Sequence, residues 1–172
     1  VFKLPDWTPF EEVEAIAKRL SAEPGVEYAE PDELVHPTRV PDDPQLSNQW
    51  HYLWPFFYAG GANLPPAWDI TTGSTQVVVA VIDTGILPHA DLVGRTVQGY
   101  DFISNAEKAN DGNGRDSDPT DPGDWITNEE ATTPNSQFYG CTARSSSWHG
   151  THVAGTIGAT TNNGIGVAGV NW

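Results

Sequence analysis

The chain has 172 residues, enough for one domain or parts of two, and it carries 23 acidic against 8 basic residues, a net charge of −15. This balance argues against a nucleic-acid partner, because phosphate binding needs clustered Lys and Arg, and against an anionic membrane surface. No apolar run approaches the ~20 residues that a membrane span needs, so we expect no membrane partner.

The first 36 residues indicate a small strand–helix–strand unit. Thr8, Pro9 and Glu11 form a helix-start pattern, in which Thr8 caps the helix and Pro9 takes its first position. Apolar residues then recur at helical spacing until the Pro-Gly pair at 24–25 ends the helix. Residues 26–30 are typical of a short strand. On its own, this unit is too small to bury a core.

A polar, proline-containing stretch over residues 37–48 predicts a linker and a domain boundary. We therefore expect two parts, residues 1–39 and residues 40–172. The aromatic-rich segment 50–58 is typical of packing rather than of a binding surface. A short helix is predicted over residues 64–70.

Residues 76–83 (QVVVAVID) give the strongest strand prediction in the chain. They are apolar on both faces, as in a central parallel strand that helices cover on both sides. The strand ends in Asp83-Thr84-Gly85, and open α/β sheets place working residues at such carboxyl ends. From the residues alone, Asp83 can equally be a turn former or a helix cap.

Residues 104–147 form a long polar stretch, and so long a loop inside a compact domain is usually functional. Residues 149–160 predict a helix that begins with His149. An Asp at a strand end and a His at a helix start fit two parts of a nucleophilic triad. The serines at 145–147 lie close by in sequence, but triads are assembled in space, and the chain has no G-x-S-x-G motif.

The motifs VAVIDTG at 79–85 and HGTHVAGT at 149–156 resemble those of the subtilisin-like serine proteases, in that family's order. The resemblance implies an α/β fold with a mostly parallel sheet and helices on both faces. It implies a serine endopeptidase in which Asp83 is the triad Asp, His149 is the general base and His152 is structural. A metal pair of His149 and His152 is disfavoured, because no third ligand has metal-site spacing.

The family's Gly-Thr-Ser-Met-Ala-type segment with the nucleophilic Ser, and its oxyanion-hole Asn, do not occur in this sequence. We therefore expect the 172 residues alone to be inactive and the C-terminal remainder of the protease to be a separate chain or a missing segment. Residues 10–32 resemble the second half of the family's propeptide, which implies a zymogen with a processing site between His36 and Asp42. A non-catalytic inhibitor-like module, or a pseudoprotease, is the alternative.

The resemblance also implies bound Ca²⁺, which takes six to eight oxygen ligands. A first site would use Asp43, Asp91 and a loop that could otherwise be a simple turn; the loop would supply the Asn163 side chain and the carbonyls of Thr160, Ile165 and Val167. A second candidate is the segment 111–124, where five Asp residues would repel one another without a cation. Its expected ligands are Asp111, Arg115, Asp116, Asp118 and Asp121. A solvated loop is the alternative there.

The chain has a single cysteine, Cys141. In an exported protease, an odd cysteine suggests a partner in another segment. The resemblance therefore leads us to expect a secreted enzyme in which Cys141 forms a disulfide with the C-terminal remainder.

Overall fold

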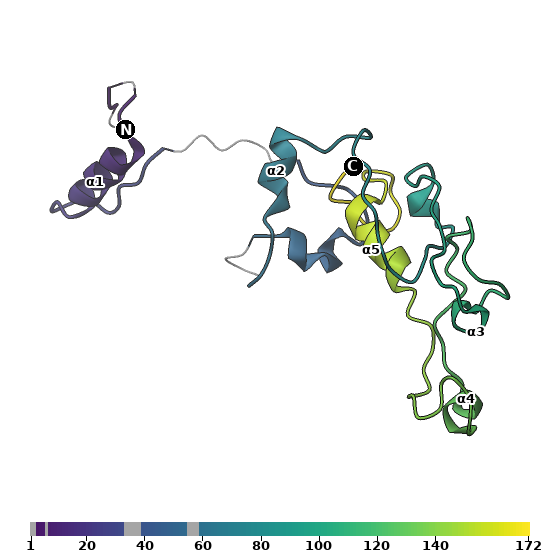
Figure 1. Ribbon diagram of the computed structural model, residues 1–172. Helices are drawn as coiled ribbons and strands as arrows, with labels where there is room; N and C mark the ends of the chain where they lie inside the picture. Colours follow the sequence, from purple (N-terminus) through teal and green to yellow (C-terminus); the bar gives the residue numbers. More distant parts are fainter. Residues whose placement is uncertain (1–2, 6, 33–38, 55–58) are drawn as a thin grey trace. The chain divides into compact units, whose positions relative to one another are not determined.

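The computed structural model of the chain describes residues 3–5, 7–32, 39–54 and 59–172 (Figure 1). It divides into two compact units, Val1–Pro37 and Thr38–Trp172, and we describe each by itself. Two segments lie outside the described residues: residues 33–38, which include the start of the predicted processing stretch, and residues 55–58 of the aromatic segment.

The first unit contains the predicted helix, α1, over Phe10–Ser21. Glu11 and Glu12 lie in its first turn and Lys18 and Arg19 in its last, so both ends carry charges that oppose the helix dipole. The predicted capping role of Thr8 is wrong. Pro9 occupies the capping position and has no side-chain group that can accept a hydrogen bond, while the Thr8 hydroxyl donates backwards to the Pro5 carbonyl at 2.7 Å.

The strand predicted over residues 26–30 is not formed in the described part of this unit. The segment instead returns to the end of α1, where the Ser21 hydroxyl donates to the Ala29 carbonyl at 3.1 Å and accepts from the Ala29 N–H at 3.0 Å. A strand needs a partner strand for its backbone groups, and the unit offers only this one side chain among its described residues. Trp7 and Tyr28 are left exposed on the unit.

The second unit is built from short helical elements joined by long loops (Figure 1). In chain order they are η1 Leu46–Asn48, η2 Trp50–Tyr52, α2 Leu64–Ile70, η3 Ala90–Leu92, α3 Ala106–Ala109, α4 Asn128–Thr132 and α5 His149–Gly158. The two predicted helices of this unit, over 64–70 and from His149 onward, are confirmed as α2 and α5. The predicted long loop contains the small helices α3 and α4.

The predicted central parallel strand over residues 76–83 is wrong as a description of this structure. Among the described residues, only isolated bridges occur, at Ile86–Thr120, Asp101–Asp116 and Ile126–Arg144, and the first of these is parallel. Val77, Val78 and Ile82 are 65%, 68% and 95% exposed. The segment has the apolar pattern of a strand covered on both faces, but a strand forms only where a second one pairs with it.

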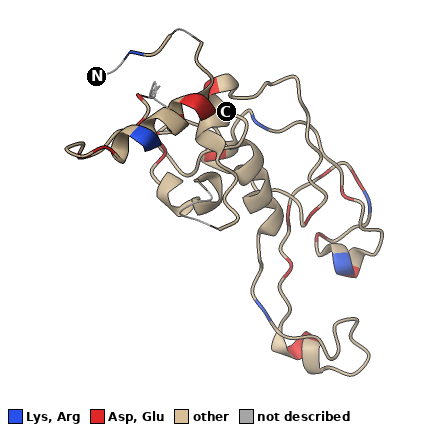
Figure 2. Ribbon diagram, turned by 90° about the vertical axis from the view of Figure 1, so that its left-hand side faces the viewer, with Lys and Arg blue, Asp and Glu red and all other residues tan. Residues whose placement is uncertain are grey.

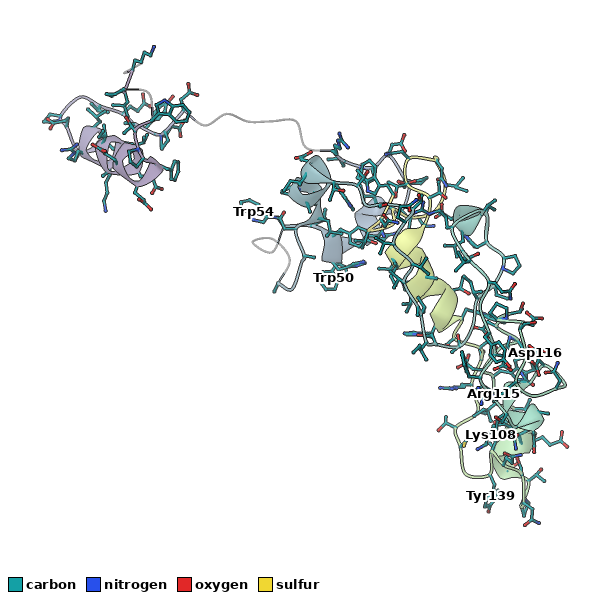
Figure 3. The ribbon with its side chains drawn as sticks, turned by 45° about the horizontal axis from the view of Figure 1, so that its top comes forward. Trp50, Trp54, Lys108, Arg115, Asp116 and Tyr139 are labelled. Carbon is teal, nitrogen blue, oxygen red and sulfur yellow. The ribbon has the colours of Figure 1, made fainter. Side chains whose placement is uncertain are left out.

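The core of this unit lies between η2, α2 and the chain end. Tyr52, Trp68 and Ala168 are almost fully buried, and Trp172 packs beside Trp68 with ring centroids 5.4 Å apart. Gln49 uses its whole amide: the nitrogen donates to the Ala168 carbonyl at 2.8 Å and the oxygen accepts from the Ala168 N–H at 2.9 Å. The aromatic segment therefore packs through Tyr52, as predicted, whereas Trp50 and Trp54 are about half exposed (Figure 3).

Tyr52 also ties this core to α5. Its hydroxyl lies 2.5 Å from the Thr156 carbonyl and 3.1 Å from the Ala168 carbonyl, so one O–H is shared between two acceptors. Burial raises the pKa of Tyr52 to about 12, although the nearby Gln49 side chain opposes the rise. The neutral phenol is therefore the form that the fold requires.

We expect Tyr52→Phe to lower the free energy of unfolding by about 1 kcal/mol, because the hydroxyl's hydrogen bond is lost while the two carbonyls keep their other donors, the Val170 N–H and the Gln49 amide. Urea denaturation followed by tryptophan fluorescence measures this. Tyr139→Phe is the matched control, since Tyr139 is exposed on the 104–147 segment (Figure 3) and should leave the unfolding free energy unchanged. Equal effects of the two substitutions would contradict the role given to Tyr52.

Alkaline pH should remove part of this stability. The pKa of Tyr52 is raised on folding, so its contribution is complete below about pH 10 and is lost as the pH rises towards 12. The measurement is the unfolding free energy of the parent minus that of Tyr52→Phe, from pH 8 to 12. A difference that stays constant over this range would show that the folded pKa is not raised.

Candidate functional site

The first residue of α5 carries the central contact of the candidate site. His149 Nδ1 lies 2.7 Å from Asp83 Oδ2 and 2.8 Å from Asp83 Oδ1. The His149 side chain is 62% exposed and that of Asp83 is 15% exposed, so the ring faces solvent and covers the carboxylate. The two residues that the sequence assigns to a triad are therefore in direct contact.

The charge on Asp83 decides how the imidazole is oriented. The pKa of Asp83 is held below its usual range, first by the Thr84 N–H, which donates to Oδ1 at 2.8 Å, and then by His149. An ionised carboxylate only accepts hydrogen bonds, so Nδ1 must be the donor. This places the remaining nitrogen, Nε2, on the side away from Asp83. Within the described part of the chain, Nε2 has no hydrogen-bond partner.

The next two residues of α5 are also bound to the segment that follows Asp83. The Gly150 N–H donates to Thr84 Oγ1 at 3.1 Å, and Thr151 Oγ1 accepts from the Leu87 N–H at 2.9 Å. A Cβ at Gly150 would collide with the Gly85 carbonyl, so the helix approaches this closely only with glycine at 150. Gly85 itself has a φ of +107°, which L side chains rarely adopt.

The long loop supplies a second layer of contacts that the sequence did not reveal. Asp121, 2% exposed, accepts from Thr84 Oγ1 at 2.6 Å. Asp124 accepts from the Ser147 N–H at 2.6 Å and from Arg144 at 3.1 Å, and the Ser147 bond is the main reason that its pKa is lowered. Both carboxylates thus contact residues beside the Asp83–His149 pair. The only sequence signal was the density of Asp in this loop, which we interpreted as a calcium site.

The structure brings together the residues predicted for the first calcium site. Asp43 and Asp91 are 4% and 2% exposed and both contact the 160–167 loop. Asp43 Oδ2 accepts from the Asn162 N–H, and Asp91 accepts from the Asn163 side chain and from the Val167 N–H, at 2.8–2.9 Å. Around them, the Thr160 N–H donates to the Asp91 carbonyl, and the Ile165 N–H donates to Asn163 Oδ1.

The residues predicted for the second calcium site are not gathered into one cluster. Asp111, Asp116 and Asp118 each accept from the backbone N–H two residues onward, at 2.7–3.0 Å. The Arg115 guanidinium lies over the Phe102 ring, 5.4 Å from its centroid. Among the described residues, no group of three or more His, Cys, Asp or Glu side chains is placed to hold a metal ion. Figure 2 shows the acidic positions spread along the loops.

Three other residue predictions have a defined place in the structure. His152 is exposed on α5 and makes no side-chain hydrogen bond or ion pair with the described residues, so its structural role stays a prediction. Ser147 uses its backbone to bind Asp124, and Ser146 adjoins Gly123. Cys141 is exposed and free.

In the described ranges, no helix is long and apolar enough to cross a membrane.

Comparison with known proteins places these features in one family. The Peptidase S8 (subtilase) family matches residues 74–172, which include Asp83 and α5. The chain is 51% identical over 158 residues to the "Extracellular protease" of Xanthomonas campestris pv. campestris, covering 92% of this chain and 26% of that protein. It is 42% identical over 173 residues to the "Extracellular basic protease" of Dichelobacter nodosus, covering 99% of this chain and 27% of that protein.

A solved protease structure from the bacterium Pseudoalteromonas arctica matches with a TM-score of 0.65 and 56% identity, over 76% of this chain and 35% of that one. The likeness is consistent with the α/β subtilase fold, although the described residues form isolated bridges rather than strands. The chain spans about a quarter of the length of the curated relatives named above. On the family match and these identities, the chain belongs to the subtilase family of peptidases.

Proposed function

We propose that this chain supplies the Asp and His of an Asp–His–Ser triad in a serine endopeptidase that hydrolyses proteins. The observation that carries the proposal is the contact of His149 Nδ1, at the start of α5, with both oxygens of Asp83. The other ring nitrogen of His149, Nε2, has no hydrogen-bond partner among the described residues. A pseudoprotease or an inhibitor-like module would have no need to keep this geometry. The relatives' names, which include "Extracellular protease" and "Thermophilic serine proteinase", support the same reaction.

In the proposed mechanism, a serine from the C-terminal remainder attacks the scissile carbonyl while His149 Nε2 takes the hydroxyl proton. Asp83 remains ionised, fixes the proton on Nδ1 and stabilises the imidazolium that forms. His149 then returns its proton to the leaving amine, and water releases the acyl-enzyme. Because the family's serine motif does not occur in the 172 residues, we propose that these residues are inactive alone.

The remaining parts of the chain have roles in the same proposal. Val1–Pro37 would be the C-terminal half of a propeptide, which fits its being a compact unit of its own and the start of the family match at residue 74. The relatives named as extracellular proteases support secretion. Cys141 is exposed, and we propose that it pairs with a cysteine of the C-terminal remainder.

We further propose that Asp43, Asp91 and the 160–167 loop hold Ca²⁺. Their chemistry fits this cation, because two buried carboxylates and an Asn side chain, which are oxygen-bearing groups, meet at one loop. In the part of the chain that the structure describes, no Lys or Arg pairs with either carboxylate, so two negative charges are buried without a cationic side chain. A bound cation would neutralise them and fix the loop. Calcium binding by the segment 111–124 stays a prediction.

The triad is tested with a matched pair of substitutions on α5. His149→Gln should abolish labelling by a serine-directed phosphonate and lower kcat by about 10⁴-fold or more, in the chain combined with its serine-bearing remainder. His152→Gln, one turn along the same helix, should leave both unchanged. Labelling of the His149→Gln protein at the parent rate would exclude His149 as the general base.

Calcium binding is tested by thermal unfolding of the chain with CaCl₂ and with EDTA. At about 100 times its dissociation constant, the ion should stabilise the folded state by about 3 kcal/mol, because it binds only that state. Asp43→Asn and Asp91→Asn should remove the dependence on calcium. Asp42→Asn is the matched control, because this neighbouring carboxylate is exposed. An identical Tm of the parent in CaCl₂ and EDTA would rule out the site.

A further inference from the structure

One buried carboxylate outside the predicted triad is bound to the residues that flank it. Asp121 is 2% exposed and accepts two hydrogen bonds on different oxygens: from Thr84 Oγ1 to Oδ2 at 2.6 Å and from the Gly123 N–H to Oδ1 at 2.9 Å. A carboxylate that only accepts fixes the direction of the Thr84 hydroxyl, which must donate to it. The lone pairs of that hydroxyl are then left to face the start of α5.

Those lone pairs are used by α5. The Gly150 N–H donates to Thr84 Oγ1 at 3.1 Å, so one hydroxyl joins Asp121 to the helix start. Thr84 directly follows Asp83, and Gly150 directly follows His149. The hydrogen-bond chain from Asp121 through Thr84 to Gly150 therefore links the backbone neighbours of both triad residues.

The backbone holds Asp121 in place for this contact. The Ile86 N–H donates to the Pro119 carbonyl at 3.0 Å, and the Asp121 N–H donates to the Ile86 carbonyl at 3.2 Å. These bonds form the parallel bridge between Ile86 and Thr120. The loop is thus fixed to the chain just after Asp83 by its main chain as well as by its carboxylate.

We propose that Asp121 is a positioning residue for the Asp83–His149 pair and acts through the Thr84 hydroxyl. The inference rests on the proposed function, and it gives Asp121 a different role from the calcium ligand that its sequence neighbourhood suggested. Its two oxygens bind Thr84 and Gly123, whereas the acidic neighbours Asp116 and Asp118 bind backbone N–H groups of their own segment and, among the described residues, form no cluster with it. Its charge strengthens the bond from Thr84, because hydrogen bonds to an ionised acceptor are shorter and stronger than neutral ones.

An amide at position 121 cannot do the same. Asn has one accepting oxygen, so its NH₂ group would face either the Thr84 hydroxyl or the Gly123 N–H. A hydroxyl that rotates away from this donor also loses its geometry with Gly150. The resulting displacement of His149 against Asp83 matters, because misplacing a catalytic group by about 1 Å can cost about 100-fold in rate.

The test uses four substitutions in the chain combined with its serine-bearing remainder, with kcat and KM measured on a peptide substrate. Asp121→Asn and Thr84→Val should lower kcat by about 10- to 100-fold and change KM less than about twofold. Thr84→Ser keeps the hydroxyl and should stay within about threefold of the parent. Asp101→Asn is the matched control and should keep the parent kcat, because Asp101 accepts from the N–H two residues onward but does not contact Thr84.

A second readout does not depend on activity. Carboxyl ¹³C NMR of the 172-residue chain should show the pKa of Asp83 moving up towards its usual range in Thr84→Val and Asp121→Asn, because its hydrogen bonds to Thr84 and His149 are disturbed, and unchanged in Thr84→Ser and Asp101→Asn. Loss of the negative charge in Asp121→Asn would by itself lower the pKa of Asp83, so a rise in that variant reports lost positioning. A parent-like kcat in Asp121→Asn, equal losses in Thr84→Ser and Thr84→Val, or an unmoved Asp83 titration would overturn the proposal. Full activity in His149→Gln would instead overturn the proposed function, and the titration would still decide the role of Asp121.

Discussion

The close contact between residues 83–87 and the start of α5 is the constraint on which the candidate site depends. Three successive helix residues bind this short segment, through the His149 ring, the Gly150 N–H and the Thr151 hydroxyl. The contact requires glycine at position 150, because any side chain there would meet the Gly85 carbonyl. The motifs around Asp83 and His149 therefore encode a docking geometry as well as two reactive groups.

The sequence predicted the site better than the fold around it. Helices α1, α2 and α5 follow from periodicity and turn residues, which act over a few positions. The pairing of Asp83 with His149 follows from two motifs that resemble those of one family. The strand prediction over 76–83 was wrong here for a physical reason. The apolar pattern shows that helices could cover both faces of this segment, whereas a strand forms only beside a partner strand, which the described residues do not provide. Val77 and Ile82 are exposed for the same reason.

Helix caps and loop contacts also depend on more than the sequence pattern from which we predicted them. At the start of α1 the capping position falls on Pro9, whose side chain cannot accept a hydrogen bond, and the Thr8 hydroxyl donates to the Pro5 carbonyl three residues before it. Asn105 and Thr127, in the long loop, do cap α3 and α4 through their side chains. Residue type allows these bonds, and the local backbone selects among them, so spacing alone does not determine which one forms.

The acidic residues separate into two groups that composition cannot distinguish. Asp111, Asp116 and Asp118 bind backbone N–H groups two residues onward, and a solvated loop needs nothing more from them. Asp91 and Asp121 also accept from groups far away in sequence, and they are buried because those distant segments cover them. Burying a carboxylate is costly unless it is hydrogen-bonded, so each one that is buried holds its partner segments in one arrangement. The excess of negative charge is therefore a solvated surface at most positions and an organising element of the site at a few.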